Sequence, residues 1–305
     1  MAIFYEFALT FGPCLYPKTN RTYTRQGKLF VCIIFERPAM STEEPAVLRS
    51  DINQVAWLTL NRPKRMNALS REMISALSSE LGKLAQDASV RVVVLKGAGV
   101  AFSSGHDLKE IMQASDRDDS QETEDTISAC TDLMLKIQRL PQPVIASVHG
   151  TATAAGCQLV AACDIAIAGS HARFATSGIN LGLFCSTPLV QLSRSVGKSA
   201  ALEMAFTGKF ISADDALRIG LVSKCVGPEV LDAEVENIAL EIASKSPVAI
   251  RLGKELFYKQ RELGIDGAYA LAMEAMNANL QNNDAREGIK AFIEKRTPPK
   301  WRDTE

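Results

Sequence analysis

The chain of 305 residues is 47% hydrophobic, which suffices for a full buried core and excludes a mainly disordered protein. Its 34 lysine and arginine residues balance 35 aspartate and glutamate residues, so the overall charge gives no reason to expect nucleic acid or an anionic membrane as a partner. No run of about 18 apolar residues indicates a membrane-spanning helix, and we expect a small-molecule ligand.

Residues 1–46 differ in character from the rest of the chain. They mix aromatic with basic residues and end in the linker-like stretch PAMSTEEPA. Acids are scarce before Glu43, as in a mitochondrial targeting segment, but the apolar runs fit such a segment poorly. We therefore expect this segment to lie outside the fold, either as a targeting segment or as a disordered start.

A regular pattern begins at Gln54. The run VAWLTL predicts a strand that ends at the turn-forming sequence NRP. Ser70 can cap a following helix, whose apolar residues recur at spacings of three and four. These residues are Met73, Leu77, Leu81 and Leu84.

Three further apolar runs predict strands, VRVVVLKG, VIASV and IAIAG, and helical patterns separate them. Strands that alternate with helices and are continuously apolar indicate an α/β fold whose sheets are covered by helices. Beyond about Ser199 the pattern is almost wholly helical, with cap signals at Ser212, Ser246 and Asp284. We divide the folded part into a core, 47–245, and a C-terminal helical region, 246–305.

Three segments of the core resemble the crotonase (enoyl-CoA hydratase/isomerase) superfamily in order and spacing. They are LNRPKRMNALS (60–70), AFSSGHDLKE (101–110) and VIASVHGTATAAGCQLVAACDIAIA (144–168). The resemblance implies a spiral of β-β-α repeats, and a C-terminal region that packs subunits into trimers or hexamers. It also implies an acyl-CoA ligand, no cofactor beyond the CoA of that ligand, and a mitochondrial location.

The resemblance further implies two backbone N–H donors for the thioester oxygen. By motif position these belong to His106, just after Gly105, and Ala155, just before Gly156. Reactions of an acyl thioester push negative charge onto its carbonyl oxygen, which preorganised donors stabilise. The second donor lies where a helix begins, so the helix dipole adds to its effect.

The CoA contacts implied by the resemblance fall in two places. Those in the core involve Arg62, Lys64, Ser104, Gly105, Asp107 and Leu108. Among them, Arg62 and Lys64 are placed to meet phosphates. The main chain of Asp107 and Leu108 is placed to meet the adenine. Phe292 and Lys295 resemble a C-terminal pair that reaches a CoA on a neighbouring subunit.

The usual catalytic pair of the superfamily is absent from this sequence. A hydratase of the family uses two glutamates to position water and to move protons, and Gln158 and Gly178 stand at their positions. Neither residue exchanges a proton near neutral pH. Because such groups each contribute on the order of 10² to 10⁴ to the rate, we expect hydration to be severely weakened, and glutamates at both positions to restore it.

Other residues near these motifs have simpler interpretations. His106 is the one near-neutral titrator among them, but we interpret its side chain as that of an ordinary loop histidine. Asp107 is interpreted as a helix cap, and Asp164 as a turn residue between helix and strand. Gln158 either orients water or substrate or fills the pocket.

The cysteines and histidines do not indicate a metal or redox site. The seven cysteines are odd in number and form no CxxC pair, so we interpret them as reduced thiols, with Cys157 and Cys163 as buried apolar groups. The three histidines, His106, His149 and His171, are too far apart in the sequence to suggest a metal site.

Two functions stay open at this point, an enzyme that acts on an acyl-CoA and a non-catalytic acyl-CoA binder. RNA binding, which some relatives acquire through a lysine-rich helix, is disfavoured. In the helix after Ser70, Arg71 and Lys83 are offset by three acids, so no basic stripe forms.

Overall fold

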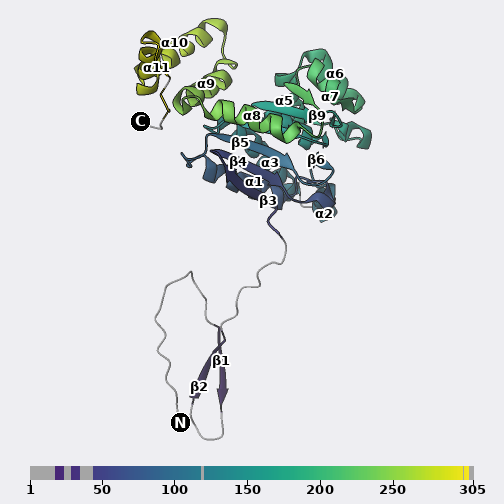
Figure 1. Cartoon of the computed structure of the whole chain (residues 1–305). Coiled ribbons are helices and arrows are strands. Elements are labelled where there is room, and N and C mark those ends of the chain that lie inside the picture. Colours follow the sequence, from purple (N-terminus) through teal and green to yellow (C-terminus); the bar gives the residue numbers. More distant parts are fainter. Residues whose placement is uncertain (1–17, 24–28, 35–43, 118–119, 298, 302–305) are drawn as a thin grey trace. The chain divides into compact units, whose positions relative to one another are not determined.

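The computed structural model describes residues 18–23, 29–34, 44–117, 120–297 and 299–301 (Figure 1). The chain divides into two compact units, Met1–Glu44 and Pro45–Glu305. In the first, strands β1 (Lys18–Tyr23) and β2 (Leu29–Ile34) pair in antiparallel fashion, although the sequence had suggested no strand there. Most of the predicted targeting segment lies outside the described residues.

In the second unit, the larger sheet of the described residues has the strand order β12-β9-β7-β5-β4-β3. Its strands are β3 (Val47–Ile52), β4 (Val55–Leu60), β5 (Val92–Gly97), β7 (Val144–Val148), β9 (Ile165–Gly169) and β12 (Lys224–Val226). Neighbouring strands are parallel except for β3 and β4. The predicted strands at VAWLTL, VIASV and IAIAG are therefore confirmed.

A smaller sheet has the order β11-β10-β8-β6. Its strands are β6 (Ala101–Ser103), β8 (Thr151–Thr153), β10 (Arg173–Ala175) and β11 (Ile211–Ser212). In the pairs β5-β6, β7-β8 and β9-β10 a strand of the larger sheet is followed directly by one of the smaller sheet, and helices come next. This repeat confirms the predicted spiral of β-β-α units.

Helices enclose and extend the two sheets. They are α1 (Arg71–Leu84), α2 (Leu108–Asp116), α3 (Ser120–Arg139), α4 (Ala155–Ala162), α5 (Ser186–Ser195), α6 (Lys198–Thr207), α7 (Ala213–Arg218), α8 (Leu231–Ala243), α9 (Pro247–Gln260), α10 (Ile265–Gln281) and α11 (Asn283–Ile293). Two short 3-10 helices, η1 (Pro63–Arg65) and η2 (Ser177–Leu181), flank the site described below. None of the helices in the described part of the chain has the length and apolar character that crossing a bilayer requires.

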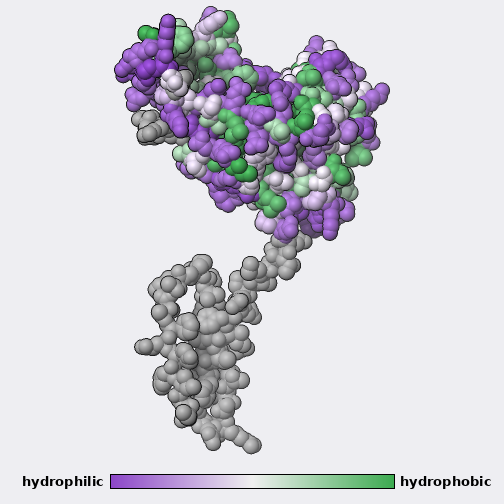
Figure 2. All heavy atoms as spheres, viewed as in Figure 1, coloured by the Kyte–Doolittle hydropathy of each residue, from purple (hydrophilic) through white to green (hydrophobic). Residues whose placement is uncertain are grey.

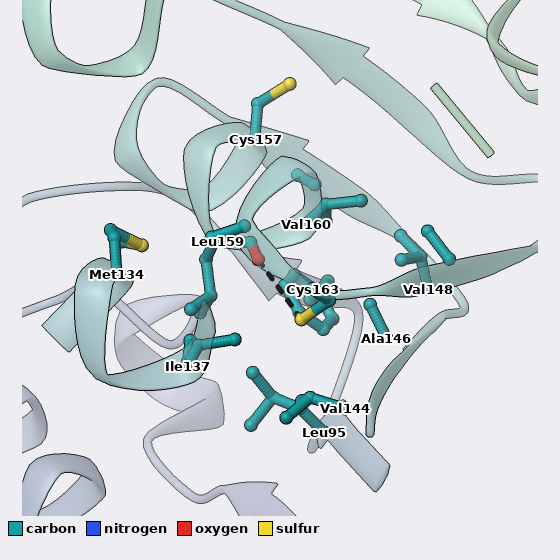
Figure 3. Packing of buried hydrophobic residues seen from close by; sticks show 14 of the residues in the cluster. Leu95, Met134, Ile137, Val144, Ala146, Val148, Cys157, Leu159, Val160 and Cys163 are labelled. Carbon is teal, nitrogen blue, oxygen red and sulfur yellow. Dashed lines mark hydrogen bonds between the residues drawn. The ribbon is translucent and has the colours of Figure 1, made fainter. Parts of the chain in front are cut away.

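The inner strands β5, β7 and β9 of the larger sheet are apolar on both faces because both faces are covered. Val93 and Leu95 of β5 belong to the main core, together with residues of α1, α3 and α4. Figure 3 shows Leu95 in this core with Ile137 of α3 and Leu159 of α4. Val92 and Val94 face the other way and pack in a second cluster with α8 (Figure 1). A continuous apolar run therefore reflects burial on two sides, as expected for parallel strands.

Several helix starts follow the predicted caps. The Ser70 hydroxyl accepts a hydrogen bond from the Met73 N–H, and Ser212 and Ser246 cap α7 and α9 in the same way. The predicted cap at Asp284 is wrong, because the Asn282 side chain caps α11. Asp284 instead accepts a hydrogen bond from the Ser246 hydroxyl at 2.5 Å, which links α11 to the start of α9.

A buried ion pair fastens the C-terminal helices to the core. The Lys254 Nζ donates to an Asp164 carboxylate oxygen at 2.7 Å, and the two side chains are 7% and 16% exposed. Lys254 also donates to two backbone carbonyls, and Tyr258 and the Val144 N–H donate to Asp164. Asp164 does lie in the predicted turn. Its carboxylate also anchors α9 through Lys254, a role that the sequence did not reveal.

We expect Lys254→Met to lower the free energy of unfolding by about 3–5 kcal/mol, because it leaves the Asp164 carboxylate buried without its cation. Lys259→Met is the matched control on the same helix. Among the described residues, Lys259 pairs only with Glu255, and both side chains are more than half exposed, so its loss should cost about 0.5 kcal/mol or less. Urea unfolding of both variants measures the difference, and equal costs would refute the anchoring role.

Candidate functional site

Two backbone segments approach each other closely at the start of α4. Gly105 has φ +87°, and a Cβ atom there would lie 2.9 Å from the Thr153 carbonyl oxygen and 3.0 Å from the Ala155 nitrogen. A Cβ atom at Gly156 would overlap the Ser103 carbonyl. Only glycine fits at both positions, and this packing brings Gly105, the residue before His106, next to the backbone of Ala155.

The two N–H groups predicted as donors have no protein acceptor in the described part of the chain. Ala155 is the first residue of α4, so its N–H lacks a partner within the helix. His106 follows the loop, and its N–H is likewise absent from the hydrogen bonds of the described backbone. The residue before the helix, Ala154, has the strained angles φ 51° and ψ −122°. A pair of free N–H groups at a helix start can receive an oxygen that carries negative charge.

Asn67 holds the loops around this site together, a role the sequence did not indicate. The side chain is fully buried, donates to the carbonyls of Ala98 and Ala101 at 2.9 and 2.8 Å, and accepts from the Arg62 N–H at 2.9 Å. The main-chain carbonyl of Asn67 accepts a hydrogen bond from the Ser103 hydroxyl at 2.9 Å. Asn67 has a positive φ of 50°, a conformation that asparagine tolerates well.

The imidazole of His106 is half-buried, and its Nε2 atom has no hydrogen-bond partner among the described residues. Burial lowers the pKa of His106, so the ring is neutral at physiological pH. The interpretation as an ordinary loop histidine is therefore incomplete, since part of the ring belongs to the interior.

Gln158 and Gly178, at the positions of the family glutamates, are both buried. The Gln158 Oε1 atom has no partner in the described residues. At Gly178 a Cβ atom would lie 2.6 Å from the Leu183 carbonyl oxygen and 2.8 Å from the Cys185 Sγ atom. The expectation that glutamates at both positions restore hydration does not suit this structure, because the loop leaves no room for a side chain at 178.

Hydroxyl and thiol groups lie close to these two residues in the chain. The hydroxyls of Thr153 and Ser177 hydrogen-bond to each other at 2.7 Å, whereas the Thr176 hydroxyl is buried without a partner in the described residues. Burial raises the pKa of Cys157 to about 12 and raises the pKa of Cys185 as well. Both thiols are therefore protonated at neutral pH and poor nucleophiles.

The predicted CoA contacts in the core lie on the loops before α1 and α2. Arg62 pairs with Glu72 at 2.5 Å, and Lys64 is exposed on η1. Asp107 accepts from the Lys109 N–H at 3.0 Å, which confirms the predicted cap of α2. Ser104, half-buried, donates its N–H to the Met66 carbonyl, and Leu108 is exposed.

Phe292 and Lys295 are not brought to the other predicted contacts within one chain. Phe292 lies in the last turn of α11 and Lys295 just beyond its end, and α11 packs against α10 and Trp301 (Figure 1). The Phe292 side chain is 84% exposed. The described residues also contain no group of three His, Cys, Asp or Glu side chains that could hold a metal ion.

The β-β-α spiral, with the Gly105 loop packed against the start of the buried helix α4, defines a protein of the crotonase class. The chain belongs to the enoyl-CoA hydratase/isomerase family, whose model matches residues 51–304. It is similar to enoyl-CoA hydratase domain-containing protein 3, mitochondrial, of Rattus norvegicus, at 47% identity over 263 residues, 86% of this chain and 87% of that protein.

Solved structures agree with this assignment. That of an enoyl-CoA hydratase from Mycobacterium smegmatis matches with a TM-score of 0.82 and 53% identity, over 84% of this chain and 99% of that one. That of human enoyl-CoA hydratase domain-containing protein 3 matches with a TM-score of 0.79 and 44% identity, over 83% and 99% of the two chains. The predicted family and fold are confirmed, and the names of the sequence relatives support the predicted mitochondrial location.

Proposed function

We propose that this chain binds acyl-CoA thioesters of fatty-acid metabolism and holds the thioester oxygen between the N–H groups of His106 and Ala155. The observation that carries the proposal is this pair of free donors, fixed by two glycines at which no Cβ fits. Relatives named as enoyl-CoA hydratases support an acyl-CoA as the kind of ligand.

The donors favour states in which the thioester oxygen gains negative charge. Removing a proton beside the carbonyl, or adding a nucleophile to the conjugated acyl group, creates an enolate. Donors that are already in place need no reorganisation as this charge develops. The axis of α4 adds the positive end of its dipole at Ala155.

Hydratase activity in this chain is proposed to be weak or altered. Gln158 and Gly178 supply no carboxylate, and the neighbouring thiols stay protonated. Of the described residues named at this site, the neutral His106 is the one whose side chain can accept a proton near pH 7. If its imidazole does not act, the function is a non-catalytic one, in which acyl-CoA is bound for sensing or sequestration; the closed packing around Gly178 favours this second candidate.

The CoA part is proposed to lie along the loops before α1 and α2. The cations of Arg62 and Lys64 meet the phosphates, and the main chain of Ser104, Asp107 and Leu108 lines the path to the adenine. Support for this path comes from the Asp107 cap and the Asn67 hydrogen bonds, which fix the same loops. Arg62 would share its guanidinium between a phosphate and Glu72.

A trimer or a dimer of trimers is proposed as the assembly. Helices α9 and α10 contain no buried hydrophobic residue in the single chain, and large apolar side chains are exposed there and on α11 (Figure 2). A cavity of about 1180 Å³ also opens beside α9, between the Arg194 and Phe257 side chains. A neighbouring subunit would cover these surfaces and bring Phe292 and Lys295 to the CoA.

We expect light scattering at micromolar concentration to give the mass of three or six chains. Met273→Glu together with Met276→Glu should reduce the mass, because both side chains are at least 60% exposed on α10 and a charge there resists burial. A monomeric mass for the unmodified chain would refute the assembly.

Gly105→Ala is expected to weaken binding of butyryl-CoA at least tenfold, since the added methyl group pushes the loop away from Ala155. Gly220→Ala is the matched control. Gly220 also has a positive φ, of 84°, but its nearest neighbour is 3.9 Å from an added Cβ, so the backbone strain is similar without the clash. Calorimetric titration of both variants measures the effect; unchanged affinity in Gly105→Ala would place the ligand elsewhere.

The unmodified chain is expected to hydrate crotonyl-CoA more slowly than about 1 per second, the lower end of typical enzyme rates. The physical reason is the lack of a carboxylate at positions 158 and 178. The absorbance of the conjugated thioester measures the rate on protein shown to bind CoA thioesters. A rate within the typical range would show that another group, His106 first, moves the proton.

A further inference from the structure

We propose that a cleft between the core and the C-terminal helices binds a small oxyanion that carries a hydroxyl group, either a hydroxycarboxylate or a phosphate. The cleft has a volume of about 460 Å³ and is lined by the loops before β5 and β7, the end of α8 and the start of α9. It is separate from the proposed thioester site, so the inference does not depend on the proposed function.

The location of the cleft follows from the parallel strands. Arg91 and Gln142 directly precede β5 and the residue before β7, and these strands are parallel neighbours, so both residues lie at the amino ends. His106 and Ala155 come after the carboxyl ends of the same strands, beyond β6 and β8. The cleft and the thioester site therefore lie toward opposite ends of β5 and β7.

A buried acceptor without a partner belongs to the lining of this cleft. Gln142 is 7% exposed. Its Nε2 atom donates to the carbonyls of Leu84, Asp87 and Val90 at 2.7, 3.3 and 3.3 Å. These acceptors fix which way the amide is turned, because its oxygen could not donate to them. The Oε1 atom is left buried without a partner among the described residues, so a ligand that meets it has to supply a donor.

A buried donor without a partner lies in the same lining. The Arg91 guanidinium donates through Nη1 to the Lys245 carbonyl at 3.2 Å and through Nη2 to the Trp301 carbonyl at 2.8 Å. The Nε atom is buried and makes no hydrogen bond within the described part of the chain. Because arginine stays protonated at neutral pH, this atom can only donate. A ligand that meets it has to supply an acceptor.

The charge around the cleft favours an anion. Its lining in the described residues contains one acid and three cations, which are Asp87, Arg91, Lys245 and Arg251. Arg49 already pairs with the acid at 2.6 Å. Glu241 lies 3.9 Å from the Lys245 ammonium, and both of these side chains are exposed, so the pairing is weak. Positive charge therefore remains at the cleft and attracts an anionic ligand.

One ligand chemistry meets both unpaired atoms and the charge. An oxyanion accepts from Arg91 Nε, and a hydroxyl on the same molecule donates to Gln142 Oε1. A plain carboxylate or a sulfate only accepts, and it leaves the glutamine oxygen unpaired. A hydroxycarboxylate and a monohydrogen phosphate each carry both groups, and both are small enough for a cleft of this volume.

The test is calorimetric titration of the full chain at neutral pH with two matched pairs of anions. Phosphate is paired with sulfate and lactate with propionate, and only the first anion of each pair carries a hydroxyl. At least one hydroxylated anion should bind about tenfold more tightly than its partner, the effect of roughly one net hydrogen bond. A preference in the phosphate pair identifies a phosphate site, and one in the lactate pair a hydroxycarboxylate site.

Variants of the lining test which residues hold the anion. Arg91→Lys keeps the charge and removes the Nε donor, and should weaken binding of the hydroxylated anion about tenfold. Arg251→Gln removes one cation and should weaken it about threefold, with a smaller effect at high salt. Arg218→Gln is the matched control, because Arg218 is on α7, outside the cleft lining, with a side chain that is 72% exposed. Its affinity should be unchanged, and urea unfolding shows that each variant is folded.

A crystal structure of the full chain grown with the tighter-binding anion locates it directly. An anion that bonds to Arg91 Nε and Gln142 Oε1 supports the inference, whereas water alone in the cleft overturns it. Equal affinity within both pairs, or no binding of phosphate and lactate at about 10 mM, also overturns it. Affinity that Lys64→Gln reduces and Arg91→Lys keeps overturns it as well, because the anion then lies on the loops proposed for the CoA phosphates.

Discussion

The site depends on the approach of two main-chain segments to within contact distance. Gly105 faces Thr153 and Ala155, and Gly156 faces Ser103, with no space for a Cβ atom at either glycine. Hydrogen bonds from Asn67 hold the loop from one side, and the smaller sheet, through the bond from Ala154 to Ala175, holds the start of α4 from the other. The placement of the His106 and Ala155 N–H groups, which have no acceptor among the described residues, follows from this packing and not from the chemistry of the His106 and Ala155 side chains themselves.

Much of the fold could be predicted because its signals are local. The run VAWLTL, the Ser70 cap and the spacing of Met73 and Leu77 each lie within a few residues, and each corresponds to the expected element. The glycines of the site could be located from motifs for the same reason. The cap at Asp284 was misjudged because Asn282, two residues earlier, competes for the same helix start.

What the sequence did not reveal are pairings between distant segments. Lys254 and Asp164 are 90 residues apart, and either alone looks like an ordinary surface charge. Asn67 joins loops more than 30 residues away through hydrogen bonds that no periodicity encodes. The unpaired state of Gln158 and Thr176 is likewise a property of the assembled interior, since polarity in a sequence does not show which partners burial leaves out.

The closed packing at Gly178 bears on how binding and proton transfer are related in this chain. A glutamate at position 178, as in the family, requires a substitution of Gly178 and also a loop with space for the larger side chain. Here the Leu183 carbonyl and the Cys185 thiol occupy that space. A carboxylate introduced at 178 would have to move backbone, which is costlier than moving a flexible side chain. The proposed donors, the N–H groups of His106 and Ala155, lie on other segments of the chain and are untouched by this change. The proposed thioester recognition and the usual proton transfer of the family therefore depend on different parts of the fold.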